Sequence, residues 1–485
     1  MRKLQKEKSN MTIKKATYMN AFSKYSVVIL NLFFTSILAR VLSPQDYGIV
    51  AVVMVFSTFF MMVAEMGLGA AVIQNKELSS GNEDGIYTAT LYLGVLFGVL
   101  FALCSFVFVR LYENQAYYFV GVLLAIYLML SIFNIVPQAI LLKERLFQVI
   151  AVRSIITCCL SYGVAIVVAF LGGKYYAILA QMIVNIAIVF LWNWKKSNLK
   201  ISKQGMVDSV KLVLNFTVFQ SLFNFVTYFA RNLDNLLVGY VMGDNQLGLY
   251  NKSYQLMRYP VSILSTVITP TLLPMLNDRQ SEREFVFRQY NKIVRILMIL
   301  GIYVSVFCFY ASEEIILIMF GEQWEGATGA FHWFSAGIIL QLIVDVRGSM
   351  YQIFGETKKL SSAGIIESFL IVVAICIGVA TRNIEQLSIC YLIGFLFYFL
   401  HCQYRLAKDC FHIPVKRMFQ PYKVPSILYM ILFLVMYFVP SLNNVLWSVV
   451  VKGIVLGVIY IALLIITNEI KYIWVMFPSN MKKIE

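Results

Sequence analysis

Residues 86–109, IYTATLYLGVLFGVLFALCSFVFV, form a run that contains no charged side chain. A run of about 20 apolar residues is long enough to cross the hydrocarbon core of a bilayer as an α-helix. The apolar residues are largely continuous rather than alternating, which argues against a membrane-spanning β-strand. This stretch therefore predicts a transmembrane helix.

Similar runs recur along nearly the whole chain. Its 485 residues are 60% hydrophobic and only 13% charged, whereas a soluble protein carries roughly a quarter charged residues. We therefore predict an all-α polytopic membrane protein with about 14 transmembrane helices. The expected spans are 18–41, 47–73, 86–109, 117–142, 149–171, 176–194, 211–241, 247–275, 293–310, 327–351, 361–381, 386–404, 425–440 and 446–467.

Basic residues between these spans indicate the orientation. Counting Lys and Arg, 28 lie on the side of the N-terminus and 3 (Arg110, Lys174 and Arg382) on the opposite side. Because cytoplasmic loops are enriched in basic residues, both termini are predicted to be cytoplasmic. The formal net charge of +15 is thus explained by topology, and nucleic-acid binding is not expected. The eight cysteines lack C-x-x-C spacing and the three histidines are scattered, so no metal or cofactor is expected.

The chain also shows a weak internal repeat. A shift of 200 residues places the first hairpin turn, residues 40–48, on residues 240–248, with Val41/Val241 and Gly48/Gly248 identical. Both turns are predicted to lie outside, and each opens a unit of six spans. A parallel repeat of two six-helix lobes is a known transporter plan, with the substrate between the lobes.

Polar and charged side chains interrupt three of the predicted spans. They lie at helical spacing on one face of the first, seventh and eighth spans, where ionisable groups usually face a cavity. Arginine binds phosphate oxygens through two hydrogen bonds and lysine adds a point charge, so an excess of cations favours an anionic substrate. The candidate cationic cavity comprises Lys24, Asn31, Arg231, Lys252, Gln255 and Arg258.

Several carboxylates and further arginines have alternative interpretations. Asp234, three residues after Arg231, is expected to neutralise it in part and fix its rotamer. Glu65 is assigned a supporting or coupling role, with a helix-boundary role as the alternative. For charged residues nearer the inner ends of their spans, snorkelling to the interface is favoured at least as much as a role in the cavity; they are Arg153, Asp345, Arg347 and Glu367.

Longer motifs resemble a known family. Residues 34–74, with ARVLSPQDYG at 39–48 and EMGLGAAVIQ at 65–74, are similar to Wzx-type polysaccharide flippases. More specific are YFARNLDNLLVG at 228–239, LGLYNKSYQLM at 247–257 and FGEQW at 320–324. The resemblance covers roughly residues 15–470. It points to the lipopolysaccharide and polysaccharide exporter branch of the multidrug/oligosaccharidyl-lipid/polysaccharide superfamily.

The resemblance implies a MATE-like fold that transports undecaprenyl-pyrophosphate-linked oligosaccharide across a bacterial inner membrane by alternating access. Related lipid II flippases line a cationic cavity with basic residues on the first and eighth spans, which here carry Lys24 and Arg258. First-span arginine is typical of those relatives, so Lys24 is a departure. Partners are the bilayer and the lipid-linked oligosaccharide, with a polymerase or glycosyltransferases as candidate contacts. Proton, sodium and membrane potential all stay open as the energy source.

On this plan the chain divides into seven parts. Two pseudo-symmetric six-helix lobes are followed by two additional helices at the C-terminal end. The expected parts are a cytoplasmic N-terminal segment 1–17, an N-lobe 18–194, a cytoplasmic linker 195–210, a C-lobe 211–404, a cytoplasmic loop 405–424, two helices within 425–467 and a cytoplasmic tail 468–485.

Two other functions compete with the flippase. A multidrug exporter of the same fold would use buried carboxylates for coupling, whereas the charges near the midplane here are mainly basic. A membrane glycosyltransferase or polymerase would need a large external loop. The longest one expected, about 311–326, carries four glutamates and no basic residue. No Walker, G-x-S-x-G or H-E-x-x-H motif is present, so we do not expect an enzyme.

Overall fold

The computed structural model describes residues 23–65, 67–74, 78, 80–202, 218–276 and 279–474. In parts of α10 (Val218–Leu276) it describes the backbone alone. Five predicted parts therefore fall wholly or partly outside the described residues: the N-terminal segment 1–17, the start of the first span, the second half of the linker 195–210, the start of the seventh span and the end of the tail. Within the described ranges the secondary structure is entirely helical, which confirms the predicted all-α class.

The chain forms two compact units, Met1–Gly248 and Leu249–Glu485. In the first unit, α4 packs along α5, α7 along α8, and α3 against α6, while α2 contacts both α5 and α8. A helix at Ser23–Val41 precedes them. The bounds are α2 Pro44–Glu65, α3 Leu68–Gln74, α4 Ser80–Tyr112, α5 Ala116–Phe133, α6 Ile135–Lys143, α7 Phe147–Phe170 and α8 Tyr175–Ser197.

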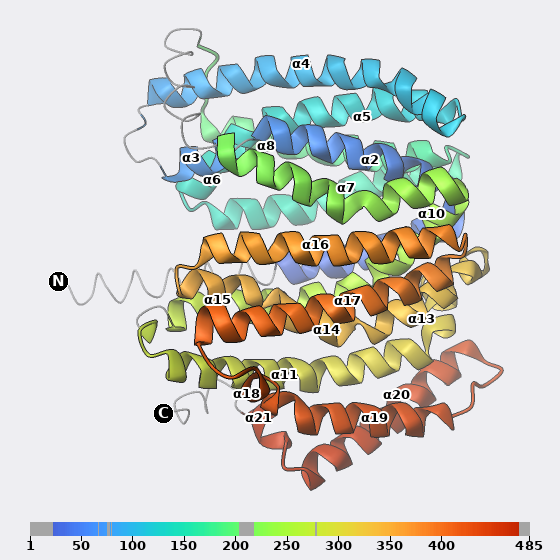
Figure 1. The fold of residues 1–485 in the computed structure, drawn as a ribbon. Helices are drawn as coiled ribbons and strands as arrows, with labels where there is room; N and C mark the ends of the chain where they lie inside the picture. The colour runs from blue at the N-terminus through green and yellow to red at the C-terminus, as the bar shows by residue number, and fades with distance from the viewer. Residues whose placement is uncertain are drawn as a thin grey trace. The chain divides into compact units, whose positions relative to one another are not determined.

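The second unit is organised around α11, which contacts α13, α14, α19 and α20. Beside this group, α16 and α17 run side by side, as Figure 1 shows. Its helices are α11 Arg283–Tyr310, α12 Ser312–Met319, η2 Glu322–Ala327, α13 Thr328–Ala336, α14 Ile338–Asp345, α15 Arg347–Ile353, α16 Thr357–Ala380, α17 Ile384–Leu406, η3 Ala407–Phe411, α18 Val415–Met418, η4 Gln420–Tyr422, α19 Lys423–Tyr437, α20 Val445–Ile466 and α21 Ile470–Trp474.

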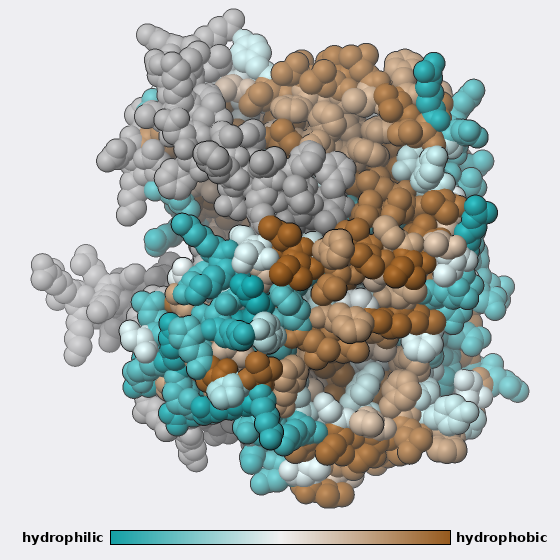
Figure 2. All heavy atoms as spheres, viewed as in Figure 1, coloured by the Kyte–Doolittle hydropathy of each residue, from teal (hydrophilic) through white to brown (hydrophobic). Residues whose placement is uncertain are grey.

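The helices have the length and composition of membrane spans. Eleven described helices are long and apolar enough to cross a bilayer, or twelve if the bent pair Glu322–Ala336 and Ile338–Ile353 is one span. By position, the two arms of α10 correspond to the seventh and eighth of the predicted spans. Figure 2 shows hydrophobic side chains over the middle of the helices, with hydrophilic ones gathered where helices end. This distribution is typical of a multi-pass membrane protein.

Two predicted elements differ from the structure. The expected loop 311–326 is largely helical, because α12 and η2 occupy most of it. The expected single span 327–351 is divided into α13, α14 and α15, with 50° between its two parts. The breaks lie at Gly337 and at Val346. Interrupted helices in transporters free backbone groups and side chains for binding, and the charged residues Asp345 and Arg347 flank the break at Val346.

The break within α10 lies at Gly243, whose φ is 84° and ψ 171°. An L-residue with a Cβ atom rarely adopts this backbone conformation. The 59-residue helix would be about 89 Å long if it were straight, which is far more than one bilayer crossing. Gly243 therefore allows two spans to follow each other with almost no connecting loop.

We expect Gly243→Ala to lower the free energy of unfolding by about 1–3 kcal/mol because alanine is strained at this φ. Thermal unfolding of the purified protein in detergent would measure the loss. Gly163→Ala is the matched control, since Gly163 lies within α7 with no neighbour within 4 Å of an added Cβ atom. Equal midpoints for the two variants would contradict a conformational requirement for glycine at 243.

Candidate functional site

Three candidate residues lie on the arm of α10 that follows Gly243. Lys252 is buried, and its Nζ donates a hydrogen bond to Gln255 Oε1 at 3.1 Å. The Nζ atom also lies 6.0 Å from the centre of the Phe320 ring. Nearly two helical turns after Lys252, Arg258 Nη1 donates to Gln341 Oε1 of α14 at 3.1 Å. The structure thus brings Lys252 and Gln255 together and gives Arg258 a neutral partner.

The candidate residues of the first unit occupy different environments. Lys24 is exposed on the helix Ser23–Val41, and Asn31 is half-buried. The thiol of Cys158 on α7 donates to Asn31 Oδ1 at 3.5 Å. On the same helix, the hydroxyls of Thr35 and Tyr162 lie 3.2 Å apart. Asn31 and Thr35 therefore contribute to packing between this helix and α7.

The predicted pairing between Arg231 and Asp234 stays a prediction, because the side chain of Arg231 lies outside the described residues. Asp234 is buried, and its Oδ1 accepts a hydrogen bond from the backbone N–H of Asn235 at 2.8 Å. Glu65 is exposed and is the last residue of α2. Gly67, with φ 76°, precedes α3, so the position of Glu65 agrees with the helix-boundary alternative.

The two hairpin turns related by the 200-residue shift contact each other. A Cβ atom added to Gly48 would lie 1.8 Å from the carbonyl oxygen of Asp244, and one added to Gly248 would lie 1.8 Å from that of Pro44. The contact is reciprocal, because positions 44 and 48 correspond to 244 and 248. Both positions that correspond across the repeat therefore require glycine for the same steric reason.

Side chains fix both turns in place. The carboxylate of Asp46 accepts hydrogen bonds from the Ser43 backbone N–H at 2.9 Å and from the Tyr175 N–H at 3.1 Å. The carboxylate of Asp244 accepts from the Asn114 side-chain amide at 3.2 Å and from the Tyr117 hydroxyl. Each turn is thus held by an aspartate that accepts a hydrogen bond from a tyrosine of another helix of the same unit, Tyr175 of α8 or Tyr117 of α5.

The expectation of snorkelling is wrong for three of its four residues. Arg153 is buried and donates to Gln138 Oε1 at 2.9 Å and to Asn193. Arg347 pairs with Glu367, whose side chain has no exposed surface. The other oxygen of Glu367 lies 3.3 Å from His401 Nδ1. These side chains bind internal partners instead of reaching the interface, although Arg153 Nε is buried without a hydrogen-bond partner among the residues that the structure describes.

A second buried ion pair was missed at the sequence level. Lys452 Nζ of α20 lies 2.5 Å from Glu314 Oε1 of α12 and donates to the Tyr310 carbonyl at 2.7 Å. The signal was present, because Lys452 falls in the middle of a predicted span and Glu314 in an acidic segment without basic residues. The pair ties α20 to α12 within the second unit.

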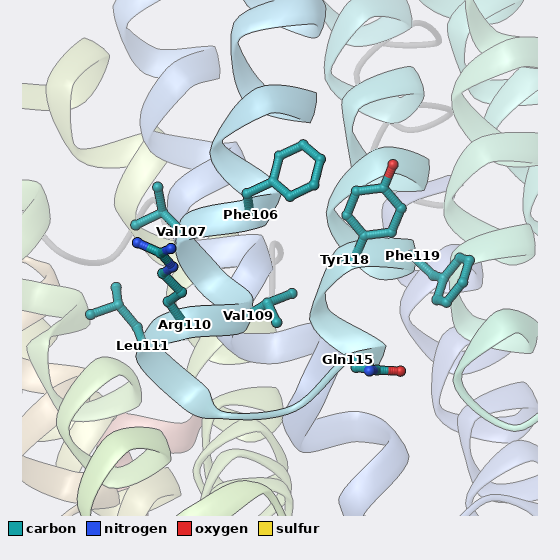
Figure 3. A pocket seen from close by; sticks show the side chains of 8 residues that line it. All are labelled: Phe106, Val107, Val109, Arg110, Leu111, Gln115, Tyr118 and Phe119. Carbon is teal, nitrogen blue, oxygen red and sulfur yellow. The ribbon is translucent and has the colours of Figure 1, made fainter.

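A surface hollow of about 840 Å³ opens at the hairpin between α4 and α5. Figure 3 shows Arg110 at the end of α4, with Phe106 on α4 and Tyr118 on α5 facing the same space. None of the candidate site residues lines it, so we do not assign a substrate to this hollow. Elsewhere in the described part of the chain, no group of three His, Cys, Asp or Glu side chains is placed to hold a metal ion.

Comparison with known proteins shows the family. Residues 37–328, more than half of the chain, match the family described as polysaccharide biosynthesis protein. The chain belongs to this family. The match includes all of the candidate site residues except Lys24 and Asn31.

Curated relatives in this family share low but extended identity. The chain is 24% identical over 297 residues to the teichuronic acid biosynthesis protein TuaB of Bacillus subtilis, covering 61% of each chain. It is 23% identical to the succinoglycan biosynthesis transport protein ExoT of Rhizobium meliloti, covering 66% of this chain and 64% of the relative. With the lipopolysaccharide biosynthesis protein WzxC of Escherichia coli, identity is 21%, covering 74% and 73%. The chain thus spans less than two thirds of the length of the first two relatives.

Solved structures show the fold of this family member. The lipid II flippase MurJ in an inward closed conformation superimposes with a TM-score of 0.71 at 14% identity, covering 93% of this chain and 99% of that one. An inward-facing multidrug resistance MATE family transporter gives a TM-score of 0.62 at 15% identity, covering 82% and 98%. The predicted MATE-like fold is therefore confirmed.

The close contacts of Gly48 with Asp244 and of Gly248 with Pro44 predict the same loss of stability for alanine at either glycine. We expect Gly48→Ala and Gly248→Ala each to lower the free energy of unfolding by about 1–3 kcal/mol, because a methyl group there would overlap a backbone carbonyl. Thermal unfolding in detergent should give similar losses for both variants, since the contact is reciprocal. Gly457→Ala is the control, with no neighbour nearer than 3.8 Å. A Gly48→Ala variant as stable as this control would contradict the contact.

The buried pair Arg347–Glu367 generates a second prediction. Glu367→Leu alone should lower the free energy of unfolding by about 3–5 kcal/mol, because it leaves a buried guanidinium unpaired. The double variant Arg347→Met, Glu367→Leu should be closer to the wild type, since neither charge remains. Chemical unfolding in detergent micelles would compare the variants. Additive losses in the double variant would argue that the two side chains do not interact.

Proposed function

We propose that this protein is a flippase for undecaprenyl-pyrophosphate-linked oligosaccharide repeat units. It moves them across the bacterial inner membrane by alternating access, for surface polysaccharide and lipopolysaccharide biosynthesis. The observation that carries the proposal is a chain of the polysaccharide biosynthesis family on a MATE-like membrane fold. Relatives named as a transport protein and as a lipid II flippase support transport rather than catalysis.

The proposed cargo site is a cationic cavity that binds the pyrophosphate. It comprises Lys24, Asn31, Arg231, Lys252, Gln255 and Arg258, with Asp234 and Glu65 in supporting or coupling roles. Arg258 supports this assignment because its partner, Gln341, is neutral, and among the described residues no carboxylate forms an ion pair with its guanidinium. Guanidinium groups bind the oxygens of a phosphate through two parallel hydrogen bonds.

The proposed domain plan consists of two lobes that alternate access to the cargo site. An N-lobe (18–194) and a C-lobe (211–404) are joined by the linker 195–210, with both termini in the cytoplasm as the basic residues indicate. The contact between residues 44–48 and 244–248 joins the first turn of each lobe on the predicted outer side. In an alternating-access cycle these turns separate to release cargo outward. Polymerase and glycosyltransferases are the proposed protein partners.

A multidrug exporter is the competing function, and it rests on likeness of fold at 15% identity. Drug resistance conferred on a pump-deficient strain would support it. The flippase proposal expects no such resistance and a defect in surface polysaccharide when the gene is deleted. These two phenotypes separate the functions without knowledge of the sugar.

We expect Arg258→Ala and Arg231→Ala to abolish the display of surface polysaccharide while the protein remains in the membrane. Loss of hydrogen bonds to a charged group costs about 1.5–3 kcal/mol, which is roughly ten- to a hundredfold in affinity. Arg258→Lys should retain part of the activity, because it keeps the charge and loses the bidentate geometry.

Quantitative immunoblotting of surface polysaccharide, normalised to protein in the membrane fraction, would measure these effects. Arg110→Ala is the matched control, because Arg110 lines the surface hollow and not the proposed cavity. Full display by both alanine variants at positions 231 and 258 would reject the cavity.

A further inference from the structure

Arg258 of α10 and Gln341 of α14 form a hydrogen bond between two helices of the second unit. Gln341 has only 3% of its surface exposed and lies on α14, the eight-residue helix between the breaks at Gly337 and Val346. Its Oε1 accepts the hydrogen bond from Arg258 Nη1 at 3.1 Å. A buried side chain in a short, interrupted helix thus determines where the guanidinium of Arg258 lies.

A second contact holds the same two helices in register. One turn after Gln341, Asp345 Oδ2 accepts a hydrogen bond from Ser265 Oγ of α10 at 2.8 Å. Ser265 follows Arg258 by two turns. Among the described residues, Asp345 forms no ion pair with Arg258. The carboxylate of α14 therefore binds a hydroxyl, and the amide of α14 binds the cation.

Three other basic residues of the second unit have carboxylate partners, whereas the buried Lys252, like Arg258, donates to an amide oxygen, Gln255 Oε1. Arg347 pairs with Glu367, Arg295 with Glu469 at 3.1 Å, and Lys452 with Glu314. In each of these pairs a carboxylate cancels the positive charge. At position 341 a glutamate would have nearly the same size and would form the same kind of pair. Glutamine instead supplies an acceptor oxygen without a charge.

We propose that Gln341 is a positioning residue that orients Arg258 while leaving its positive charge available for the pyrophosphate of the lipid-linked cargo. This inference rests on the proposed flippase function. The amide fixes one nitrogen of the guanidinium, and the remaining N–H groups of its planar fork are directed to the anion. An ionised acceptor at 341 would compete with the pyrophosphate for the same charge.

Two substitutions at one position separate charge from packing. Gln341→Glu keeps the hydrogen bond and adds a negative charge, whereas Gln341→Met keeps the size and removes the hydrogen bond. If Gln341 matters only as a structural hydrogen bond, glutamate should be tolerated better than methionine. If the positive charge of Arg258 must stay available for the pyrophosphate, Gln341→Glu should lower cargo affinity more than Gln341→Met.

The control is Gln138→Glu in the first unit. Gln138 also accepts a hydrogen bond from a buried arginine, Arg153, at 2.9 Å, but neither residue belongs to the proposed cavity. The same chemical change is thus made beside a different guanidinium. We expect it to leave cargo binding unchanged.

The experiment measures binding of undecaprenyl pyrophosphate, and of uncharged undecaprenol, to the purified full-length protein in detergent by native mass spectrometry. For Gln341→Glu we expect affinity for the pyrophosphate to fall roughly tenfold or more, with undecaprenol binding and the thermal midpoint unchanged. Gln341→Met should lose only several-fold. Wild-type pyrophosphate affinity in Gln341→Glu, or a greater loss in Gln341→Met, would overturn the inference.

Failure of the inference and failure of the proposed function give different results. A wild-type protein that binds undecaprenyl pyrophosphate no better than undecaprenol contradicts the function itself. A wild-type protein that prefers the pyrophosphate, with the preference intact in Gln341→Glu, contradicts only the role of Gln341. If Gln341→Glu does not accumulate, Gln341→Met decides alone, because wild-type affinity in that variant would exclude a positioning role.

Discussion

The pairing of charged side chains away from water is the constraint on which the rest of this structure depends. A polar group enclosed by helices in a bilayer has no water to bind, so an uncompensated charge there is costly. The helices satisfy the backbone internally, and the arrangement of the helices must then satisfy the side chains. Arg347 with Glu367 and Lys452 with Glu314 show the usual solution, in which opposite charges meet within one unit.

Arg258 has a different solution, on which the proposed cargo site rests. Its partner is an amide, and none of the ion pairs in the described part of the chain includes Arg258. Arg153 has amide partners too, but it is buried among Gln138 and Asn193 of the first unit. Arg258 is only half-buried, which leaves part of its guanidinium accessible. The proposed capture of an anionic cargo would use such a cation, held in place by a neutral partner.

Much of the fold could be predicted from the sequence because apolar runs and basic connections are local signals. The all-α class, the apolar spans and the turn at 242–246 within α10 follow from residues near one another in the chain. The division of 327–351 into three helices could not be predicted, since neither Gly337 nor Val346 is a strong helix breaker within an apolar run.

The candidate site could be predicted only in part. Helical spacing assigned Arg258 to a polar stripe, but its partner lies 83 residues away on α14. The sequence likewise did not reveal that Arg347 would meet Glu367, because the two belong to successive helices separated by a turn. Position along a span indicates depth, whereas pairing depends on which helix faces are adjacent. That information is carried by the packing and not by the hydrophobic pattern.

The reciprocal contact at Gly48 and Gly248 has a consequence for ancestry. A surface in which position 44 meets 248 while 48 meets 244 is self-complementary, as in the isologous interface of a two-fold symmetric dimer. A half-length ancestor with this turn would already have carried both sides of the joint. Gene duplication and fusion would then have linked two protomers that recognised each other, with glycine required sterically at both copies of the contact.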